Sequence, residues 1–362
     1  MLKPTHVQRL LGARRAVRDA RIDAMLICPS QDFLYLTGYM PHKSERMLTL
    51  VVTPSKVALL CPQLEADAAA LALKGIPVWR WSDGEDAVDV LRERLGRSRR
   101  LAVNAVMRAD WVVRLAESLP EPRIRSAAPL LDSLRASKDA GEIRRLAAAA
   151  AQADRVMGFA RGQLKAGVTE ESVALKIMKK FRALGAVNPW ALVASGENGG
   201  MPHHSYGPRK LRRGDVIIVD LGAELDGYQS DITRTFFLGE PSPEARRVYD
   251  IVLGAQSAGR AAVMAGASGR SADRAAREFI TRHGYGKFFM HRLGHGLGMD
   301  IHEAPYLSAD NRAPLPAGAV VTVEPGIYMP GKFGVRLEDV VVAQPRGART
   351  LTSFPLDRAL LR

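Results

Sequence analysis

Short apolar runs alternate with stretches of helical periodicity along the first third of the chain. Each run has five or six residues and is mostly apolar, which is typical of buried strands. The predicted strands cover residues 24–28, 47–52, 56–61, 77–81 and 100–104. Apolar residues at helical spacing predict helices near residues 4–20, 63–74, 84–96 and 109–119. This alternation of strands and helices predicts an α/β sheet domain.

A proline-rich stretch follows this domain. Residues 120–134, PEPRIRSAAPLLDSL, are interpreted as a connector, so the predicted domains are residues 1–134 and 135–362. No glycine-rich phosphate loop follows any of the predicted strands, and a nucleotide site is therefore not expected in the first domain.

The second domain is predicted to open with two helices. Asp139 with Glu142 three residues later matches the capping-box pattern, and Gly167 is expected to end this long helix. Thr169 is a suitable N-cap for a second helix, which Gly185 closes.

The same order of elements is predicted twice in the second domain. A strand at residues 190–195 precedes a hairpin whose turn contains Asp226–Gly227. In the second copy the predicted elements are a helix from Ser242–Pro243, a helix capped by Ser271, a strand near residues 288–291 and a hairpin at residues 319–343. The repeat of helix, helix, strand and hairpin predicts a pseudo-symmetric catalytic domain with a site between its halves.

Each predicted hairpin carries two carboxylates. Asp220 and Asp231 flank a midpoint at Leu225–Asp226, and Glu324 and Glu338 flank a midpoint at Gly331, so each pair is expected to lie nearly opposite across its hairpin. Opposed residues have Cβ atoms about 4.5–5.5 Å apart, where like charges repel. A pair of divalent cations is the obvious compensation. For Asp220 alone, an ion pair with an arginine is an alternative.

A histidine completes the predicted ligand set. His295 lies between glycines in LGHGLG, where the backbone can approach a ligand closely. Four carboxylates and one imidazole can hold two divalent cations, and this oxygen-rich set favours manganese, with cobalt, iron or zinc left open. Two metals can generate hydroxide at neutral pH and polarise a carbonyl, which indicates a metallohydrolase.

Four more histidines lie near these segments. His203 and His204 are in a polar loop, His291 precedes His295 by four residues, and His302 follows it by seven. An imidazole near the metals can hydrogen-bond a developing oxyanion, whereas the alternative is a solvent-exposed loop histidine.

Composition excludes several other classes of protein. The chain has 362 residues, 47% of them apolar, and a net charge of +14, with only 12 lysines among its 52 basic residues. No nucleic-acid motif or aromatic stacking series accompanies this charge, so nucleic acid is not an expected partner. Two cysteines without CxxC spacing predict reduced, buried thiols. The start of the chain lacks the apolar run of a signal peptide, and no stretch is long enough for a membrane span, which favours the cytoplasm.

These motifs together resemble a known family. The segments GHGLGMDIHEAP, VEPGIY, GVRLED and VDLGAELDGYQSDITRTF are similar to those of the pita-bread metallopeptidases, and most similar to the Xaa-Pro dipeptidase (prolidase) and aminopeptidase P branch. Residues 32–39, DFLYLTGY, resemble part of the creatinase-type N-terminal domain of this branch. The resemblance implies an α+β pita-bread catalytic domain with pseudo-twofold symmetry, preceded by an α/β creatinase-type domain.

The resemblance also implies roles for individual residues. It implies that Asp231 and Glu338 share the two metals with their partners. The remaining implied active-site residues are His203 rather than His204, His291, His302, and Arg336 as a support of the ligand network. Glu324 is the expected carrier of the proton of the attacking water.

The expected activity is hydrolysis of small peptides with proline as their second residue. Xaa-Pro dipeptidase is the favoured prediction, and aminopeptidase P, which acts on longer Xaa-Pro-Yaa peptides, is the alternative. A creatinase-like hydrolase or a catalytically silent binding module would be expected to lack ligands, and all five are present. The resemblance favours a homodimer.

Overall fold

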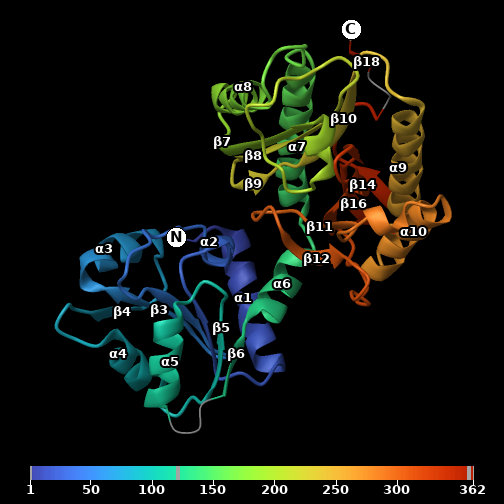
Figure 1. The fold of residues 1–362 in the computed structure, drawn as a ribbon. Helices are drawn as coiled ribbons and strands as arrows, with labels where there is room; N and C mark the ends of the chain where they lie inside the picture. The colour runs from blue at the N-terminus through green and yellow to red at the C-terminus, as the bar shows by residue number, and fades with distance from the viewer. Residues whose placement is uncertain (1, 120–122, 357–359, 362) are drawn as a thin grey trace. The chain divides into compact units, whose positions relative to one another are not determined.

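The computed structural model describes residues 2–119, 123–356 and 360–361. The chain divides into two compact units, Met1–Leu134 and Arg135–Arg362 (Figure 1). Each unit has its own apolar core. Within the described ranges, no helix combines the length and apolar character needed to cross a membrane.

The first unit is built on a six-stranded mixed sheet. Its strands are β1 (Ala24–Ile27), β2 (Thr49–Val52), β3 (Val57–Pro62), β4 (Val78–Trp81), β5 (Arg100–Val103) and β6 (Arg123–Ser126), in the order β4-β3-β2-β1-β5-β6. Its helices are α1 (Pro4–Asp19), α2 (Gln31–Thr37), α3 (Gln63–Ala72), α4 (Ala87–Leu95), α5 (Ala109–Ser118) and α6 (Ala128–Ala136). The central strands β1 and β2 are buried along their whole length, which explains their unbroken apolar runs.

The prediction of a connector at residues 120–134 is wrong for residues 123–134, and residues 120–122 lie outside the described residues. This stretch contains β6 and most of α6, and β6 pairs in parallel with β5. Strand β6 has no apolar run that would predict it from the sequence. It lies at the sheet edge, where Arg123, Arg125 and Ser126 are exposed. The short helix α2, capped by Ser30, was not predicted either.

The second unit repeats one order of elements, as predicted. The first half consists of α7 (Ala140–Arg161), α8 (Glu170–Ala183), β7 (Val187–Ser195), the short helix η1 (Gly196–Gly200), β8 (Val216–Leu225), β9 (Tyr228–Gln229) and β10 (Ile232–Leu238), with β18 (Leu360–Leu361) added beside β10. The second half consists of α9 (Pro243–Ala262), α10 (Gly269–Arg282), η2 (Gly286–Phe288), β11 (Gly294–Gly296), β12 (Glu303–Leu307), β13 (Val320–Val323), β14 (Gly326–Met329), β15 (Phe333–Arg336), β16 (Asp339–Gln344) and β17 (Gly347–Thr350). In each half, two helices accompany a five-stranded sheet, and the second half has a further two-stranded sheet of β14 and β15 (Figure 1).

Helix ends show which capping predictions hold. The Asp139–Glu142 capping box is confirmed, with both reciprocal hydrogen bonds present. Helix α7 ends at Arg161 rather than near Gly167, because tighter turns after Gly162 bring Leu164 into the core. The N-cap of α10 is Ser268 and not Ser271, since the Ser268 side chain accepts from the Ser271 N–H.

Residues 288–291 do not form the predicted strand. Two of their backbone carbonyls have another partner, because the Arg277 guanidinium donates to the oxygens of Phe289 and His291 at 2.9 and 2.7 Å. The strand of this region is β11, a few residues later, and it contains His295.

The Glu324 and Glu338 hairpin is interrupted where its two carboxylates lie. Strands β13 and β16 pair up to Val323 and Asp339, and pairing resumes between Gly326 and Arg336 in a separate two-stranded sheet. The register is the same on both sides of the gap, which places Glu324 opposite Glu338, as the predicted midpoint at Gly331 requires.

Because the ladder is interrupted, the N–H groups of Glu324 and Glu338 form hydrogen bonds with other segments. The N–H of Glu324 donates to Leu293 O at 2.8 Å, and the N–H of Glu338 donates to Thr233 O at 3.1 Å. The second bond joins the two halves of the unit directly at the carboxylates.

The Asp220 and Asp231 hairpin has a different register from the one predicted. Its turn is centred between Asp226 and Gly227, which have φ values of 50° and 78°, because a two-residue turn of this hand needs both central residues in the left-handed region. Asp220 therefore pairs with Thr233, and Asp231 lies two residues away on the same face. The two aspartates are diagonal rather than opposed.

Replacement of the turn glycine tests how firmly this hairpin is held. We expect Gly227→Ala to lower the free energy of unfolding by about 1–2 kcal/mol, because alanine disfavours the left-handed region although nothing lies within 4 Å of the new Cβ. Urea unfolding followed by circular dichroism measures the change. Gly158→Ala, inside α7 with an ordinary 3.7 Å contact, is the matched control and should be neutral or stabilising. Equal losses in both variants would contradict the role of the turn.

Candidate metal centre

One cavity of about 600 Å³ collects every predicted site residue. Strand β8 carries Asp220, β11 carries His295 and β15 carries Arg336. The remaining predicted residues at the cavity lie in loops or strand gaps, and they are His203, Asp231, His291, His302, Glu324 and Glu338. Segments from both halves of the pseudo-symmetric unit thus meet at one place.

His295 presents one defined nitrogen to the carboxylates. Its Nδ1 lies 3.1 Å from Gly296 O, and because a carbonyl can only accept, Nδ1 carries the proton of this bond. Nε2 then faces Glu324 Oε1 at 3.3 Å and Asp231 Oδ2 at 3.6 Å. A backbone hydrogen bond that fixes the tautomer in this way is typical of metal-binding histidines.

The negative charges of the neighbouring carboxylates repel one another, and this repulsion changes their pKa values. Burial, together with the neighbouring carboxylates, raises the pKa of Asp231 and of Glu338 well above ordinary values. Burial also raises the pKa of Glu324, but its contact with His295 outweighs burial and brings that pKa down to about 2. A site that disfavours several of its own negative charges is one that a cation would stabilise.

The donor atoms fit a divalent cation. One ligand atom each from Asp231, His295 and Glu338 lies within 4.8 Å of the others, and all three residues are buried. Among the described residues, Asp220 Oδ1 and Glu338 Oε1 are buried oxygens without a hydrogen-bond partner. Buried polar atoms are nearly always paired, so these two oxygens point to coordination.

Arg336 makes the ion pair that was considered as the alternative for Asp220. Its Nη2 donates to Asp220 Oδ2 at 2.7 Å, while burial raises and Arg336 lowers the pKa of Asp220, with a net rise. The arginine engages one oxygen and leaves the other towards the cluster. The ion pair and the ligand role are therefore compatible.

Three polar residues that the sequence analysis missed bind the ligands or their supports. Thr233 Oγ1 donates to Glu338 Oε2 at 2.8 Å, and Thr322 Oγ1 donates to Glu324 Oε1 at 3.2 Å. The buried Tyr328 hydroxyl lies 3.0 Å from Arg336 Nη1 and 2.9 Å from His291 Nε2. Each threonine lies two residues from a ligand, and the period of two along a strand could have revealed both.

The two adjacent histidines of the MPHH segment have different surroundings. His203 lines the cavity, whereas His204 does not and instead places Nε2 2.9 Å from the buried Glu170 carboxylate. The ring of His302 lies against that of His295 with centroids 4.3 Å apart. Of the two adjacent histidines, only His203 therefore lies at the cavity.

A buried ion cluster anchors the segment that carries His302. The next residue, Glu303, is paired with Lys138 Nζ at 2.8 Å and with Arg135 Nη2 at 2.5 Å, and Arg135 also reaches Asp300. Burial raises the pKa of Glu303, but the two cations outweigh it and lower that pKa. The carboxylate is thereby kept charged as an anchor.

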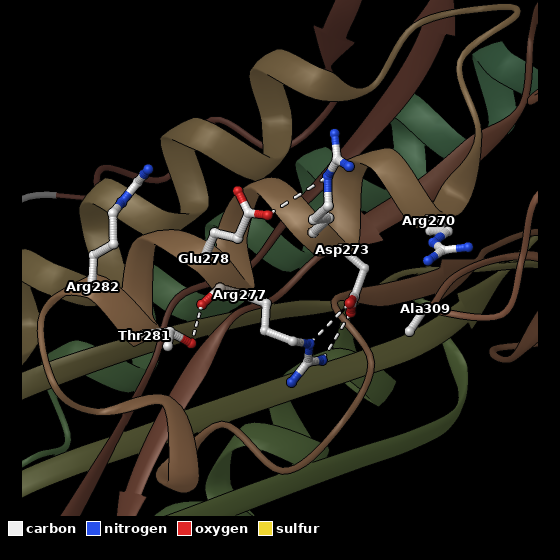
Figure 2. A pocket seen from close by; sticks show the side chains of 8 residues that line it. Arg270, Asp273, Arg277, Glu278, Thr281, Arg282 and Ala309 are labelled. Carbon is white, nitrogen blue, oxygen red and sulfur yellow. Dashed lines mark hydrogen bonds and ion pairs between the residues drawn. The ribbon is translucent and has the colours of Figure 1, made fainter.

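Helix α10 anchors the segment before β11. Asp273 accepts two bonds from Arg277 and one from the N–H of Leu293, while Arg277 also binds the carbonyls of Phe289 and His291. Figure 2 shows the Asp273–Arg277 pair in the groove along α10. This clamp sets the path of the chain towards His295.

A pseudo-symmetric fold with five metal-type ligands in one cavity defines a metal-dependent hydrolase. Residues 144–345 match Metallopeptidase family M24, and residues 9–137 match the Creatinase/Prolidase N-terminal domain. The chain therefore belongs to metallopeptidase family M24. The predicted pita-bread catalytic domain and creatinase-type domain are confirmed.

Known relatives extend over nearly the whole chain. The probable dipeptidase PepE of Mycobacterium bovis is 36% identical over 357 residues, covering 97% of this chain and 95% of that protein. The Xaa-Pro dipeptidase of Pyrococcus furiosus is 32% identical, covering 95% and 97%. The crystal structure of dipeptidase PepE from Mycobacterium ulcerans has a TM-score of 0.94 at 36% identity, covering 99% and 98% of the two chains.

Metal loading tests the ligand set. We expect manganese at 100 times its Kd to stabilise the protein by about 2.7 kcal/mol, and Asp231→Asn to lose both this stabilisation and most bound metal. Thermal unfolding and elemental analysis measure the two effects. Asp226→Asn, at the exposed turn of the same hairpin, is the control and should bind metal normally. Full metal content in Asp231→Asn would remove this residue from the ligand set.

Proposed function

We propose that this chain is a two-metal Xaa-Pro dipeptidase. The observation that carries the proposal is the convergence of Asp220, Asp231, His295, Glu324 and Glu338 on one cavity, with two buried oxygens unpaired. The oxygen-rich donor set favours manganese. Relatives of similar length that are named dipeptidase and Xaa-Pro dipeptidase support the substrate class.

Two divalent cations held by these ligands would supply a hydroxide nucleophile at neutral pH and polarise the scissile carbonyl. The protein would contribute proton transfer and charge stabilisation. The Glu324 carboxylate lines the cavity, with Oε1 3.3 Å from His295 Nε2, so it is placed to take the proton of the attacking water. The same proton would then pass to the leaving proline nitrogen.

Histidines at the cavity would stabilise the tetrahedral intermediate. His203 and His302 both line the cavity, and each can donate a hydrogen bond to a developing oxyanion. Tyr328 and Arg336 would hold His291 and Asp220 in place through the contacts described above. Charge stabilisation would thus fall to histidines in loops, and metal binding to residues of β8 and β11 together with three carboxylates in loops or strand gaps.

The cavity also offers an apolar surface for a proline ring. Trp190 and Leu192 extend from β7, and Pro202 and Ile301 come from loops at the same cavity. Proline differs from other residues by its ring and tertiary amide, so a shaped apolar wall suits it. We assign these four side chains to that wall.

Domain boundary, assembly and location complete the proposal. The break between Leu134 and Arg135 is proposed as the boundary of the catalytic domain. The homodimer and the cytoplasmic location remain predictions that rest on the family resemblance and the sequence.

Peptide length distinguishes the favoured activity from aminopeptidase P. We expect the manganese-loaded protein to cleave Met-Pro, to leave a Met-Pro-containing tripeptide largely intact, and to lose activity with chelator. Amino-acid release measured by chromatography gives both rates. Faster cleavage of the tripeptide would assign the chain to the aminopeptidase P class, and no cleavage of either by metal-loaded protein would refute Xaa-Pro hydrolysis.

Replacement of His302 separates catalysis from metal binding. We expect His302→Ala to lower kcat about 10²-fold, the loss typical of one oxyanion donor, with metal content unchanged. Steady-state kinetics and elemental analysis measure the two quantities. His283→Ala, at the exposed end of α10, is the control. Loss of metal in His302→Ala would make His302 a ligand or a structural support instead.

A further inference from the structure

A fully buried carboxylate outside the cavity holds the loop that carries His203. Glu170, the first residue of α8, is 0% exposed. Its Oε1 accepts from Ser195 N at 2.7 Å, from Ser195 Oγ at 2.6 Å and from Asn198 Nδ2 at 3.1 Å. Its Oε2 lies 3.1 Å from Asn198 Nδ2 and 2.9 Å from His204 Nε2. The carboxylate thus binds both ends of residues 195–204.

His204 has a particular place among these partners. In the described part of the chain, it is the one side chain able to carry positive charge that pairs with Glu170. Arg209 is close, but it donates to Ser195 Oγ and is paired with Asp215 and Glu197. Because a buried carboxylate is costly without compensation, the His204 bond is a strong constraint on the loop.

Two further contacts hold the loop of residues 195–204. Val193 N donates to Ser205 O at 2.7 Å, which returns the loop to β7 beside the cavity. Gly200 packs against the β14–β15 hairpin so closely that a Cβ there would lie 2.5 Å from Met329 O. The loop is therefore held by β7, by the hairpin and by Glu170.

The ring of His203 depends on this support. It lines the cavity, but no hydrogen bond to another described residue orients it. Its direction is set by the backbone between Pro202 and His204, and His204 is the residue tied to Glu170. A small displacement of a catalytic group is enough to lower a rate about 10²-fold.

We propose that Glu170 and His204 form a positioning pair that aims His203 at the reacting carbonyl. Neither residue touches the cavity, and their effect on catalysis passes through His203. The inference rests on the proposed function, since His203 has a task only if an oxyanion forms in the cavity.

A double-mutant cycle tests the proposal in the metal-loaded full chain with Met-Pro as substrate. We expect His203→Ala to lower kcat about 10²-fold and His204→Leu to lower it about tenfold or more, with KM and metal content little changed. His204→Gln, which keeps an N–H donor, should restore most of the activity. Adding His204→Leu to His203→Ala should cause no further loss, because both changes remove one function.

Two results would overturn the pair. The first is a double variant whose losses multiply, because His204 would then act independently of His203. The second is a His204→Leu variant with wild-type kcat. His283→Leu, the same substitution at the exposed end of α10, is the control and should leave kcat unchanged.

Hydrogen exchange tests the anchor without relying on activity. Glu170→Gln and His204→Leu should each speed amide exchange at residues 193–204, while Glu171→Gln, the exposed neighbour of Glu170, should not. Unchanged exchange in both anchor variants would refute the pair whatever the substrate proves to be. Failure of the wild-type protein to cleave Xaa-Pro peptides would refute the proposed function alone.

Discussion

Repulsion among buried carboxylates is the constraint around which the second unit is arranged. Asp220, Asp231, Glu324 and Glu338 share one cavity, and burial with mutual repulsion raises the pKa of Asp231 and Glu338. Such a cluster is tolerable only with compensating donors and cations. Arg336, His295 and the two threonines supply part of this compensation from the protein itself. The two unpaired buried oxygens show where it is incomplete, and a metal ion is the group that fits there.

The backbone adapts to this cluster by giving up regular pairing at the ligands. The second hairpin keeps one register on both sides of Glu324 and Glu338 but interrupts its ladder between them. Their N–H groups bind Leu293 and Thr233 instead, and the latter bond ties the second half of the unit to the first. Interruption of the strands therefore serves both to aim the carboxylates and to close the pseudo-symmetric halves on each other.

Buried ion pairs outside the cavity then fix the segments that carry the histidines. Glu303 with Lys138 and Arg135 anchors the segment of His302, and Asp273 with Arg277 anchors the segment before His295. Glu170 anchors the loop of His203. In each case a carboxylate that is at least nine-tenths buried binds an irregular segment of backbone. Such a carboxylate can fix the position of a loop that has no strand pairing.

The sequence by itself determined the candidate ligand set, the repeated order of elements and most strands and helices, because these follow from local periodicity, capping residues and residue chemistry. Asp226–Gly227 and Gly331 located both hairpin turns. Only the tertiary structure decided the diagonal register of Asp220 and Asp231, the edge strand β6 and the irregular path of residues 288–291. Each depends on partners distant in the sequence, such as the Arg277 guanidinium that takes the carbonyls a strand would have used. The separate surroundings of His203 and His204 depend likewise on Glu170, more than 30 residues earlier in the chain.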